Sequence, residues 1–351
     1  MGNYYINGIG CISAQDSSDN ETGFQNFVEL TENLVPLHKP DYKKYIKPNM
    51  IRRMSVGVKM GVVASSIALQ EAGVEIPEAI VTGSGMGCLR DSEKFLKNIV
   101  DNDEQFLTPT AFIQSTHNTV GAQIALGLGC KAYNITYVHD ATSFETSLID
   151  AMMMMDEGEQ NILVGGVDEI GSYTTDLHKL VGHVKEDVSD SLLNSNTKGA
   201  IYSEGSQFFV LENEKKDNSY AQLVAIEIYN ELSENEVSQI FDSFLKDNNL
   251  TISEIDLIVL GVNGDVDYDN YYISLQDSIL KNTPQAYYKH FSGEYNTASA
   301  FGMWTACNII KSQEVPDRLM LNTLKSSSIK NVVLYNQYRG KNHSFVLLKS
   351  C

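Results

Sequence analysis

The sequence predicts an α/β protein built from two similar halves. Strands and helices alternate along most of the chain, which is typical of a parallel-rich sheet covered by helices on both faces. This order occurs twice, over about residues 1–213 and again over 219–351, with the charged segment 215–220 between the two runs. A chain of 351 residues is long enough for more than one hydrophobic core. We therefore expect an N-terminal half over 1–214 and a C-terminal half over 219–351.

The elements of the first half follow from periodicity and from glycine signals. Residues 4–13 are predicted to form a strand that runs into a turn. Residues 54–73 place small and apolar residues at helical spacing and end on Gly73, which is typical of a buried helix. The later elements are predicted as strand 79–88, helix 91–102, helix 117–129, strand 133–138, helix 142–158, strand 161–170 and strand 205–213.

The second half repeats this alternation. Residues 221–230 are predicted to form a strand, and the apolar positions of 234–249 recur at the spacing of an amphipathic helix. The later elements are predicted as strand 254–264, helix 268–280, helix 295–310 of small residues, and a terminal hairpin of strands 331–337 and 343–349.

Composition excludes several classes of function. The formal net charge is −19, from 26 basic and 45 acidic residues, so we expect no nucleic-acid partner. No stretch has the ~20 apolar residues of a membrane span, and the N-terminus lacks a secretion signal, so we expect a cytoplasmic protein. The five cysteines are scattered outside any CxxC or Cys/His cluster, so we expect neither disulfides nor a zinc site. Nothing in the sequence indicates a cofactor.

The segment 133–170 is the most informative about chemistry. The strand YNITYV (133–138) turns sharply at HDATS (139–143) into a helix that begins near Thr142. Such an elbow presents a nucleophile at a helix N-terminus, where the dipole and free N–H groups lower the pKa of a thiol. The helix is followed by LVGGVDE (163–169).

This arrangement resembles the β-ketoacyl synthase family, which has the thiolase fold. Several other segments agree with that family in order and spacing. They are IRRMS (51–55), VTGSGMG (81–87), LTPTAFIQSTHNTVGAQIA (107–125), YSEGSQFFVLENE (202–214) and YYKHFSGEYNTASAFG (287–302). The resemblance implies a five-layer α-β-α-β-α fold with two duplicated halves, in which buried helices lie between the sheets.

Condensing enzymes of this family use a cysteine at the elbow and two histidines from later loops. On the matching positions, the cysteine falls on Ala141, the first histidine on Asp265 and the second on Glu294. No cysteine lies between 131 and 306, so a slip of one residue supplies no nucleophile. The resemblance therefore implies that all three catalytic side chains are replaced, and whether the chain is an enzyme stays open.

Other residues near these positions are candidates for a pocket or gate. Thr142 and Ser143 carry hydroxyls, which need an adjacent base to act as nucleophiles. His139 is weighed as that base, with a hydrogen-bonded core histidine as the alternative. The family's terminal glycine-rich loop is represented by NQYRGKNHS (336–344), which keeps an aromatic residue and loses the glycine run. The pocket or gate candidates are Phe112, His139, Thr142, Ser143, Phe144 and Tyr338.

The replaced histidines suggest a charged cluster in the old site. We expect Asp265, Glu294 and Lys289 to converge there, with the lysine offsetting two carboxylates that would otherwise raise each other's pKa. One reading is a new acid/base site. The other is a structural plug, in which the ion-paired side chains fill a pocket that no longer has a catalytic role.

A family member without the nucleophile resembles a chain length factor. The resemblance implies a subunit that pairs with an active ketosynthase and shapes the tunnel in which a polyketide, aryl-polyene or fatty-acid-type chain grows on an acyl carrier protein. One alternative is a ketosynthase-fold enzyme with altered chemistry at Asp265 or Glu294. A second alternative is a homodimeric scaffold or binding protein.

Two surfaces follow from this hypothesis. Strand 133–138 is apolar and, in relatives, pairs across a twofold axis, so we expect a dimer with a ketosynthase or with a second copy. An acidic carrier, if this chain touches it, requires a local basic patch, for which a solvated loop is the alternative. The candidates are Lys39, Lys43, Lys44, Lys47, Arg52 and Arg53.

Overall fold

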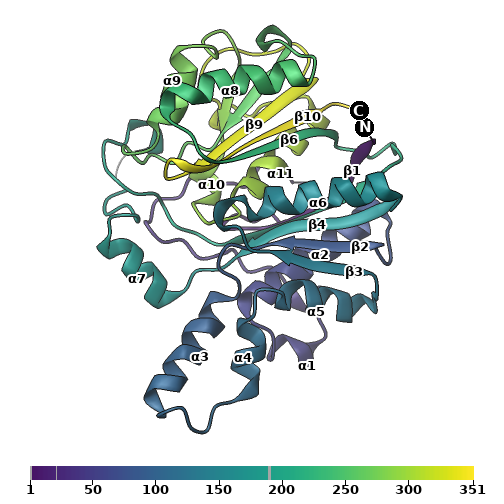
Figure 1. Cartoon of the computed structure of the whole chain (residues 1–351), viewed down its shortest axis with the longest axis vertical. Coiled ribbons are helices and arrows are strands. Elements are labelled where there is room, and N and C mark those ends of the chain that lie inside the picture. The colour runs from purple at the N-terminus through teal and green to yellow at the C-terminus, as the bar shows by residue number, and fades with distance from the viewer. Residues whose placement is uncertain (1, 21, 189–190) are drawn as a thin grey trace.

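The computed structural model describes residues 2–20, 22–188 and 191–351, and their strands form one hydrogen-bonded sheet of ten strands (Figure 1). The strand order is β3-β2-β4-β5-β1-β6-β10-β9-β7-β8. The strands are β1 (Tyr4–Ile12), β2 (Ala79–Gly83), β3 (Tyr133–Tyr137), β4 (Asn161–Asp168), β5 (Gly205–Glu212), β6 (Ala221–Glu231), β7 (Leu257–Leu260), β8 (Gln285–Tyr287), β9 (Asn331–Tyr338) and β10 (Lys341–Lys349).

The sheet has the same topology in both halves of the chain. From the outer edge inward, the first half runs β3-β2-β4-β5-β1, and the second runs β8-β7-β9-β10-β6. In the first half, β2 is parallel to β3 and β4, and β5 is antiparallel to β4 and β1. In the second half, β7 is likewise parallel to β8 and β9, and β10 is antiparallel to β9 and β6. This repeat confirms the predicted duplication. The limits proposed for the halves, 1–214 and 219–351, stay predictions.

The two halves meet through their inner strands. β1 pairs antiparallel with β6, with Tyr4 opposite Leu223 and Ile6 opposite Ala221. The two expected sheets are therefore joined by hydrogen bonds, because each inner strand would otherwise leave its backbone groups unpaired.

Helices occupy three layers around these strands. In Figure 1, α6 and α11 lie between the strands of the two halves, α2 and α5 lie beneath the first half, and α8 and α9 lie above the second. No helix in the described ranges has the length and apolar character needed to cross a bilayer. The helices are α1 (Pro48–Ile51), α2 (Val56–Ala72), α3 (Leu89–Asp101), α4 (Pro109–Ser115), α5 (Thr119–Leu128), α6 (Ser143–Glu157), α7 (Ser172–Leu180), α8 (Glu234–Asp247), α9 (Asn270–Asp277), α10 (Lys289–Ser292) and α11 (Ser299–Ser312).

The central layer explains why α6 and α11 are rich in small residues. Ala151 on α6 and Ala300 and Ala306 on α11 are fully buried between strands of both halves. Small side chains let each helix approach a sheet on either side. This arrangement confirms the predicted five-layer α-β-α-β-α fold of the thiolase type.

Five of these short helices and strands are absent from the sequence prediction. They are α1, α4, α7, β8 and α10, each of nine residues or fewer. Segments of this length carry too few turns or alternations for periodicity to identify them, and packing decides their conformation. α4 is still marked locally, since Pro109 occupies its first turn.

We expect Gly10→Ala to destabilise the fold by roughly 1–3 kcal/mol. β1 packs so closely on α2 that a Cβ on Gly10 would collide with the backbone oxygen of Ala64. Gly127→Ala is the matched control, because Gly127 is an exposed residue of α5 and a Cβ there meets nothing within 4 Å. That control should stabilise the protein by about 0.5–1 kcal/mol. Urea denaturation measures both changes, and equal effects would contradict the close β1–α2 contact.

Candidate functional site

The elbow between β3 and α6 is the centre of the candidate site. A turn of 3₁₀ helix, Asp140–Thr142, precedes α6, and Ala141 is buried there. The strained residue is Asp140, whose φ is 53°. A left-handed backbone conformation is uncommon for a residue other than glycine, and such strained residues cluster at functional sites. Sequence reasoning placed the key position on Ala141 and missed Asp140, because strain has no sequence signature.

Side chains from the second half hold Asp140 in place. Its carboxylate accepts hydrogen bonds from the Nδ2 of Asn296, just before α11, and from the Nδ2 of Asn342 on β10, the latter at 3.0 Å. The elbow is therefore fixed where the two halves meet, and Asp140 is exposed at its mouth.

The neighbouring hydroxyls stabilise the turn and lack an adjacent base. The Oγ1 of Thr142 donates to the His139 carbonyl at 2.9 Å, and the Oγ of Ser143 donates to the Asp140 carbonyl at 2.7 Å. His139 is exposed, with its Nδ1 3.2 Å from the Oγ1 of Thr146, so the alternative of a core histidine is wrong. Phe144, predicted as a pocket or gate residue, is fully buried and packs against Phe209 in the central core, because its helix position faces the sheet.

Glu294 and Lys289 form a buried ion pair. The Nζ of Lys289 lies 2.7 Å from the Oε2 of Glu294, and their side chains are 1% and 3% exposed. The Nδ2 of Asn263 donates to the same oxygen at 2.7 Å. Contacts among these three residues join the loop that follows β7, the short helix α10 and the segment that leads into α11.

Asp265 joins this cluster only indirectly. Its backbone N–H donates to the Oδ1 of Asn263 at 3.1 Å, and its own Oδ1 accepts from the backbone N–H of Asp267. The expected convergence therefore applies to Lys289 and Glu294, while Asn263 links Asp265 to them. Nearby, burial raises the pKa of Asp269 to about 7, against hydrogen bonds from the N–H groups of Asn263 and Gly264.

Another buried carboxylate belongs to Glu145 on the first turn of α6. Its Oε1 accepts a hydrogen bond from the Oγ of Ser344 at 2.8 Å. Complete burial raises the pKa of Glu145, and the charge of Lys289 acts in the opposite direction. Sequence reasoning missed this residue, since helical spacing alone does not distinguish an inward-facing glutamate from a solvated one.

An open groove of about 730 Å³ borders the elbow, and the predicted pocket residues His139 and Thr142 line it together with Asp140. The space beside Glu294 is much smaller. A cavity of about 40 Å³ lies above Glu294 and is bordered by Tyr202, Tyr338, His178 and Asn296. We call it the residual cavity. Tyr338, a predicted pocket residue, does line it, whereas Phe112 lies on α4 with 54% of its surface exposed and contacts Phe95. No group of metal-ligating side chains occurs among the described residues.

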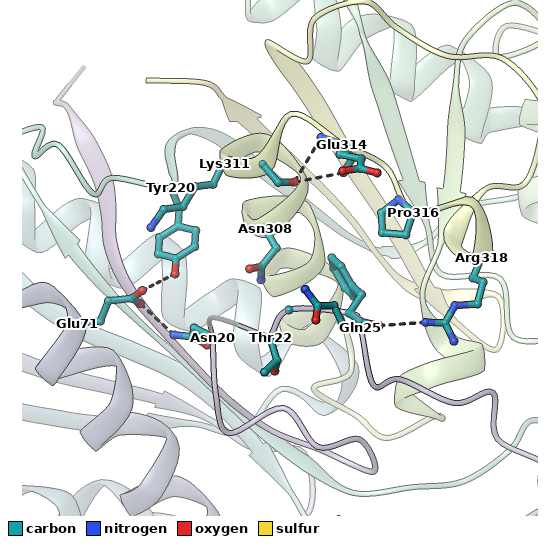
Figure 2. A pocket seen from close by; sticks show the side chains of 13 residues that line it. Asn20, Thr22, Gln25, Glu71, Tyr220, Asn308, Lys311, Glu314, Pro316 and Arg318 are labelled. Atoms are coloured by element: carbon teal, nitrogen blue, oxygen red, sulfur yellow. Dashed lines mark hydrogen bonds between the residues drawn. The ribbon is translucent and has the colours of Figure 1, made fainter.

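Another groove lies apart from all of these residues. It measures about 580 Å³, and Figure 2 shows its polar wall, where Glu71 accepts from Tyr220 and Asn20 while Lys311 and Arg318 stand on other sides. The ammonium of Lys311 lies 3.7 Å from the centre of the Tyr220 ring. This groove contains none of the predicted site residues.

The basic patch predicted at 39–53 is on the surface. Its lysines and arginines are exposed on the short helix Tyr42–Lys44 and on residues that precede it or flank α1. The Nζ of Lys44 lies 5.2 Å from the ring centre of Tyr45. Its proposed role in docking stays a prediction.

Comparison with known proteins agrees with this geometry. Residues 31–173 match the family model described as the β-ketoacyl synthase N-terminal domain. This part of the chain is therefore similar to the N-terminal domain of β-ketoacyl synthases. No curated protein matches the sequence.

Solved structures extend the β-ketoacyl synthase fold over the whole chain. The ishigamide ketosynthase/chain length factor is 17% identical, with a TM-score of 0.82, covering 100% of this chain and 99% of that one. A β-ketoacyl synthase from Burkholderia phymatum STM815 is 15% identical with a TM-score of 0.78, and each chain is covered completely. The ketosynthase ApeO in complex with its chain length factor ApeC, from Xenorhabdus doucetiae, is 14% identical with a TM-score of 0.78. The match covers 100% of this chain and 98% of that one. At these identities the likeness shows the fold.

Proposed function

We propose that this chain is a non-catalytic subunit of chain-length-factor type that pairs with an active ketosynthase. The observation that carries the proposal is the elbow, where a buried alanine stands at the position matched to the family's nucleophile. Glu294, at the position matched to the second histidine, forms a buried ion pair with Lys289 at 2.7 Å. A side chain without a nucleophilic atom cannot form the acyl-enzyme that condensation requires.

The buried pair favours a plug over a new acid/base site. A general base must reach its substrate within hydrogen-bonding distance. Glu294 already accepts from Lys289 and Asn263, and the residual cavity of about 40 Å³ leaves no room for an acyl chain beside it. The altered-chemistry alternative predicts turnover by this chain alone, which the reconstitution below measures.

An apolar surface along the outer strand supports pairing. β3 is the edge strand of the first half, and exposed apolar side chains flank it on α5 and α6. We define the edge surface as Leu126, Tyr133, Val138 and Met153. An edge strand with apolar neighbours invites association with another chain. Structural neighbours include a ketosynthase in complex with its chain length factor, which supports a ketosynthase as the partner.

Co-expression with a ketosynthase that retains Cys, His and His tests the pairing. We expect the two chains to co-purify and to extend a carrier-bound chain only together. Tyr133→Lys combined with Met153→Lys should abolish co-purification, because two charges would be buried at the edge surface. Ile273→Lys is the control, since Ile273 is an equally apolar exposed residue on α9 of the other half. Turnover by this chain alone would contradict the proposal, and a stable homodimer indifferent to the ketosynthase would favour the scaffold.

The substrate class follows from the same relatives. One structural neighbour is a type II polyketide acyl-carrier protein in complex with its ketosynthase bound to a hexaketide, at 14% identity and a TM-score of 0.73. This supports elongation of a polyketide or aryl-polyene chain on a carrier protein.

The basic patch gives a testable role in carrier docking. We expect replacement of Lys43, Lys44 and Lys47 together by Glu to slow loading of the ketosynthase partner from an acidic carrier. Each exposed pair contributes only ~0–1 kcal/mol, so the effect should be collective and should fade as salt rises. Steady-state turnover at low and high ionic strength measures it. Unchanged turnover at low salt would assign carrier docking wholly to the partner.

A further inference from the structure

An acidic side chain lies against the outermost strand of the first half. β3 forms this edge, with α6 on one face and α5 on the other (Figure 1). The Nδ2 of Asn134 on β3 donates to the carbonyl of Gly121 on α5. Because successive side chains of a strand point to opposite faces, Tyr133 and Tyr137 face α6. Both tyrosines interact there with Asp150, which places this aspartate beside the edge surface.

The carboxylate of Asp150 is without a cation in the part of the chain that the structure describes. None of the ion pairs found there includes it. Its Oδ2 is buried and has no hydrogen-bond partner among the described residues. Burial raises the pKa of this carboxyl, the hydroxyls of Tyr137 and Tyr133 lower it, and the charge of Glu157 raises it again. A partly buried carboxylate in this state would be stabilised by a complex that supplied a cation.

A second copy of this chain would place two such carboxylates close together. Two β3 strands that pair antiparallel at their edges are related by a twofold axis perpendicular to the sheet, so both α6 helices lie on one face. Asp150 interacts with Tyr133 and Tyr137, the first and last residues of β3, and therefore lies near its middle. A pairing centred on β3 brings this middle to the axis. Lys131 and His139 lie two residues beyond the ends of β3 and are displaced from the axis.

We infer that Asp150 determines the specificity of the edge surface: it excludes a second copy of this chain and fits a partner that presents a lysine or arginine opposite it. Like charges that meet in a desolvated interface oppose association, whereas a cation would bond to the unpaired Oδ2. Tyr133 and Met153, the apolar neighbours on β3 and α6, would exclude water from that bond. The inference rests on the proposed function, because it takes the partner to be a ketosynthase.

Self-association of the purified chain gives the first test, which needs no ketosynthase. Asp150→Asn keeps the size of the side chain and removes its charge. The dissociation constant of the homodimer, measured by sedimentation equilibrium, should therefore fall roughly tenfold or more. Asp277→Asn is the matched control and should leave this constant unchanged, because Asp277 is an exposed aspartate on α9 of the other half. Equal self-association of Asp150→Asn and the parent chain would overturn the inference.

A charge swap tests the facing geometry directly. Asp150→Lys presents the cation that the partner is inferred to carry. A mixture of this variant with the parent chain should form a one-to-one dimer, roughly tenfold or more tighter than either chain forms with itself. Rising ionic strength should weaken the mixed dimer and strengthen self-association of the parent. Circular dichroism checks that Asp150→Lys is folded, and Asp150→Asn keeps the inference testable if it is not. A folded variant whose mixture binds no more tightly than the parent alone would overturn the inference.

Co-purification with a ketosynthase separates this inference from the proposed function. Asp150→Asn should weaken that complex roughly tenfold or more, whereas Asp277→Asn should leave it intact. A ketosynthase that binds the parent and Asp150→Asn equally well would overturn the inference and leave the proposed function standing. The absence of any complex with a ketosynthase would overturn the proposed function, while the charge requirement measured by the swap would remain.

Discussion

Replacing Lys289 by methionine is expected to lower the free energy of unfolding by about 3–5 kcal/mol, the usual cost of leaving a buried charge without its partner. The Nζ of Lys289 lies 2.7 Å from Glu294, and both side chains are almost fully buried. Methionine has a similar length but offers no charge, so Glu294 would retain only the amide of Asn263. Denaturant unfolding followed by far-UV circular dichroism measures the loss.

The double variant Lys289→Met with Glu294→Gln is the control for this result. A neutral glutamine can keep the hydrogen bond from Asn263 without carrying a buried charge, so most of the lost stability should return. Destabilisation of the double variant equal to that of the single one would show that packing of the lysine stem, and not its charge, is what matters. It would also weaken the interpretation of the pair as a plug.

Restoring a cysteine with Ala141→Cys is expected to leave condensation absent. The positions matched to the family's two histidines carry Asp265 and Glu294, and each general acid/base or oxyanion group typically contributes ~10²–10⁴-fold in rate. The new thiol would also be buried beside an exposed carboxylate at Asp140 and without a base. Turnover should therefore stay at least ~10⁴-fold below that of an intact ketosynthase assayed alongside.

Intact-mass and peptide analysis after incubation with acyl donors or cerulenin tests the same site in the parent chain. We expect no stable adduct on residues 139–145. Cys351 is exposed and serves as the internal control for nonspecific thiol labelling. An adduct within 139–145 in the parent chain would refute the proposed lack of a nucleophile, and condensation by Ala141→Cys would refute the role given to the missing histidines.

Much of the fold was predictable from local patterns. Apolar strands and glycine-terminated helices marked β1, α2, β4, α6 and α8 within a few residues, because each spans enough turns or alternations to show its period. The short α7 and β8 were not predictable, since nothing in nine or three residues outweighs the packing around them. The β1–β6 pairing was also beyond the sequence, as it joins segments more than 200 residues apart.

The candidate site likewise has residues that the sequence predicted and residues that it could not predict. The replacements at Ala141, Asp265 and Glu294 were read from motif positions, and the proximity of Lys289 to Glu294 followed from their spacing in one segment. Asp140, Glu145 and Asp150 were missed, because backbone strain, the inward direction of a helical side chain and an unpaired charge appear only in three dimensions. Phe144 was misplaced for the same reason, since one helix position decides whether it faces a pocket or the core.

By itself, the sequence determined the duplicated α/β order of the elements and the identity of the residue at the elbow position matched to the family's nucleophile. Side-chain identity fixes which atoms exist, so the side chain of Ala141 offers no nucleophilic atom, whatever its surroundings. Only the tertiary structure decided that Glu294 is neutralised by Lys289 while the buried Oδ2 of Asp150 has no hydrogen-bond partner in the described part of the chain. The energy of a charge depends on burial and on distances of a few ångströms, and segments remote in the sequence set both.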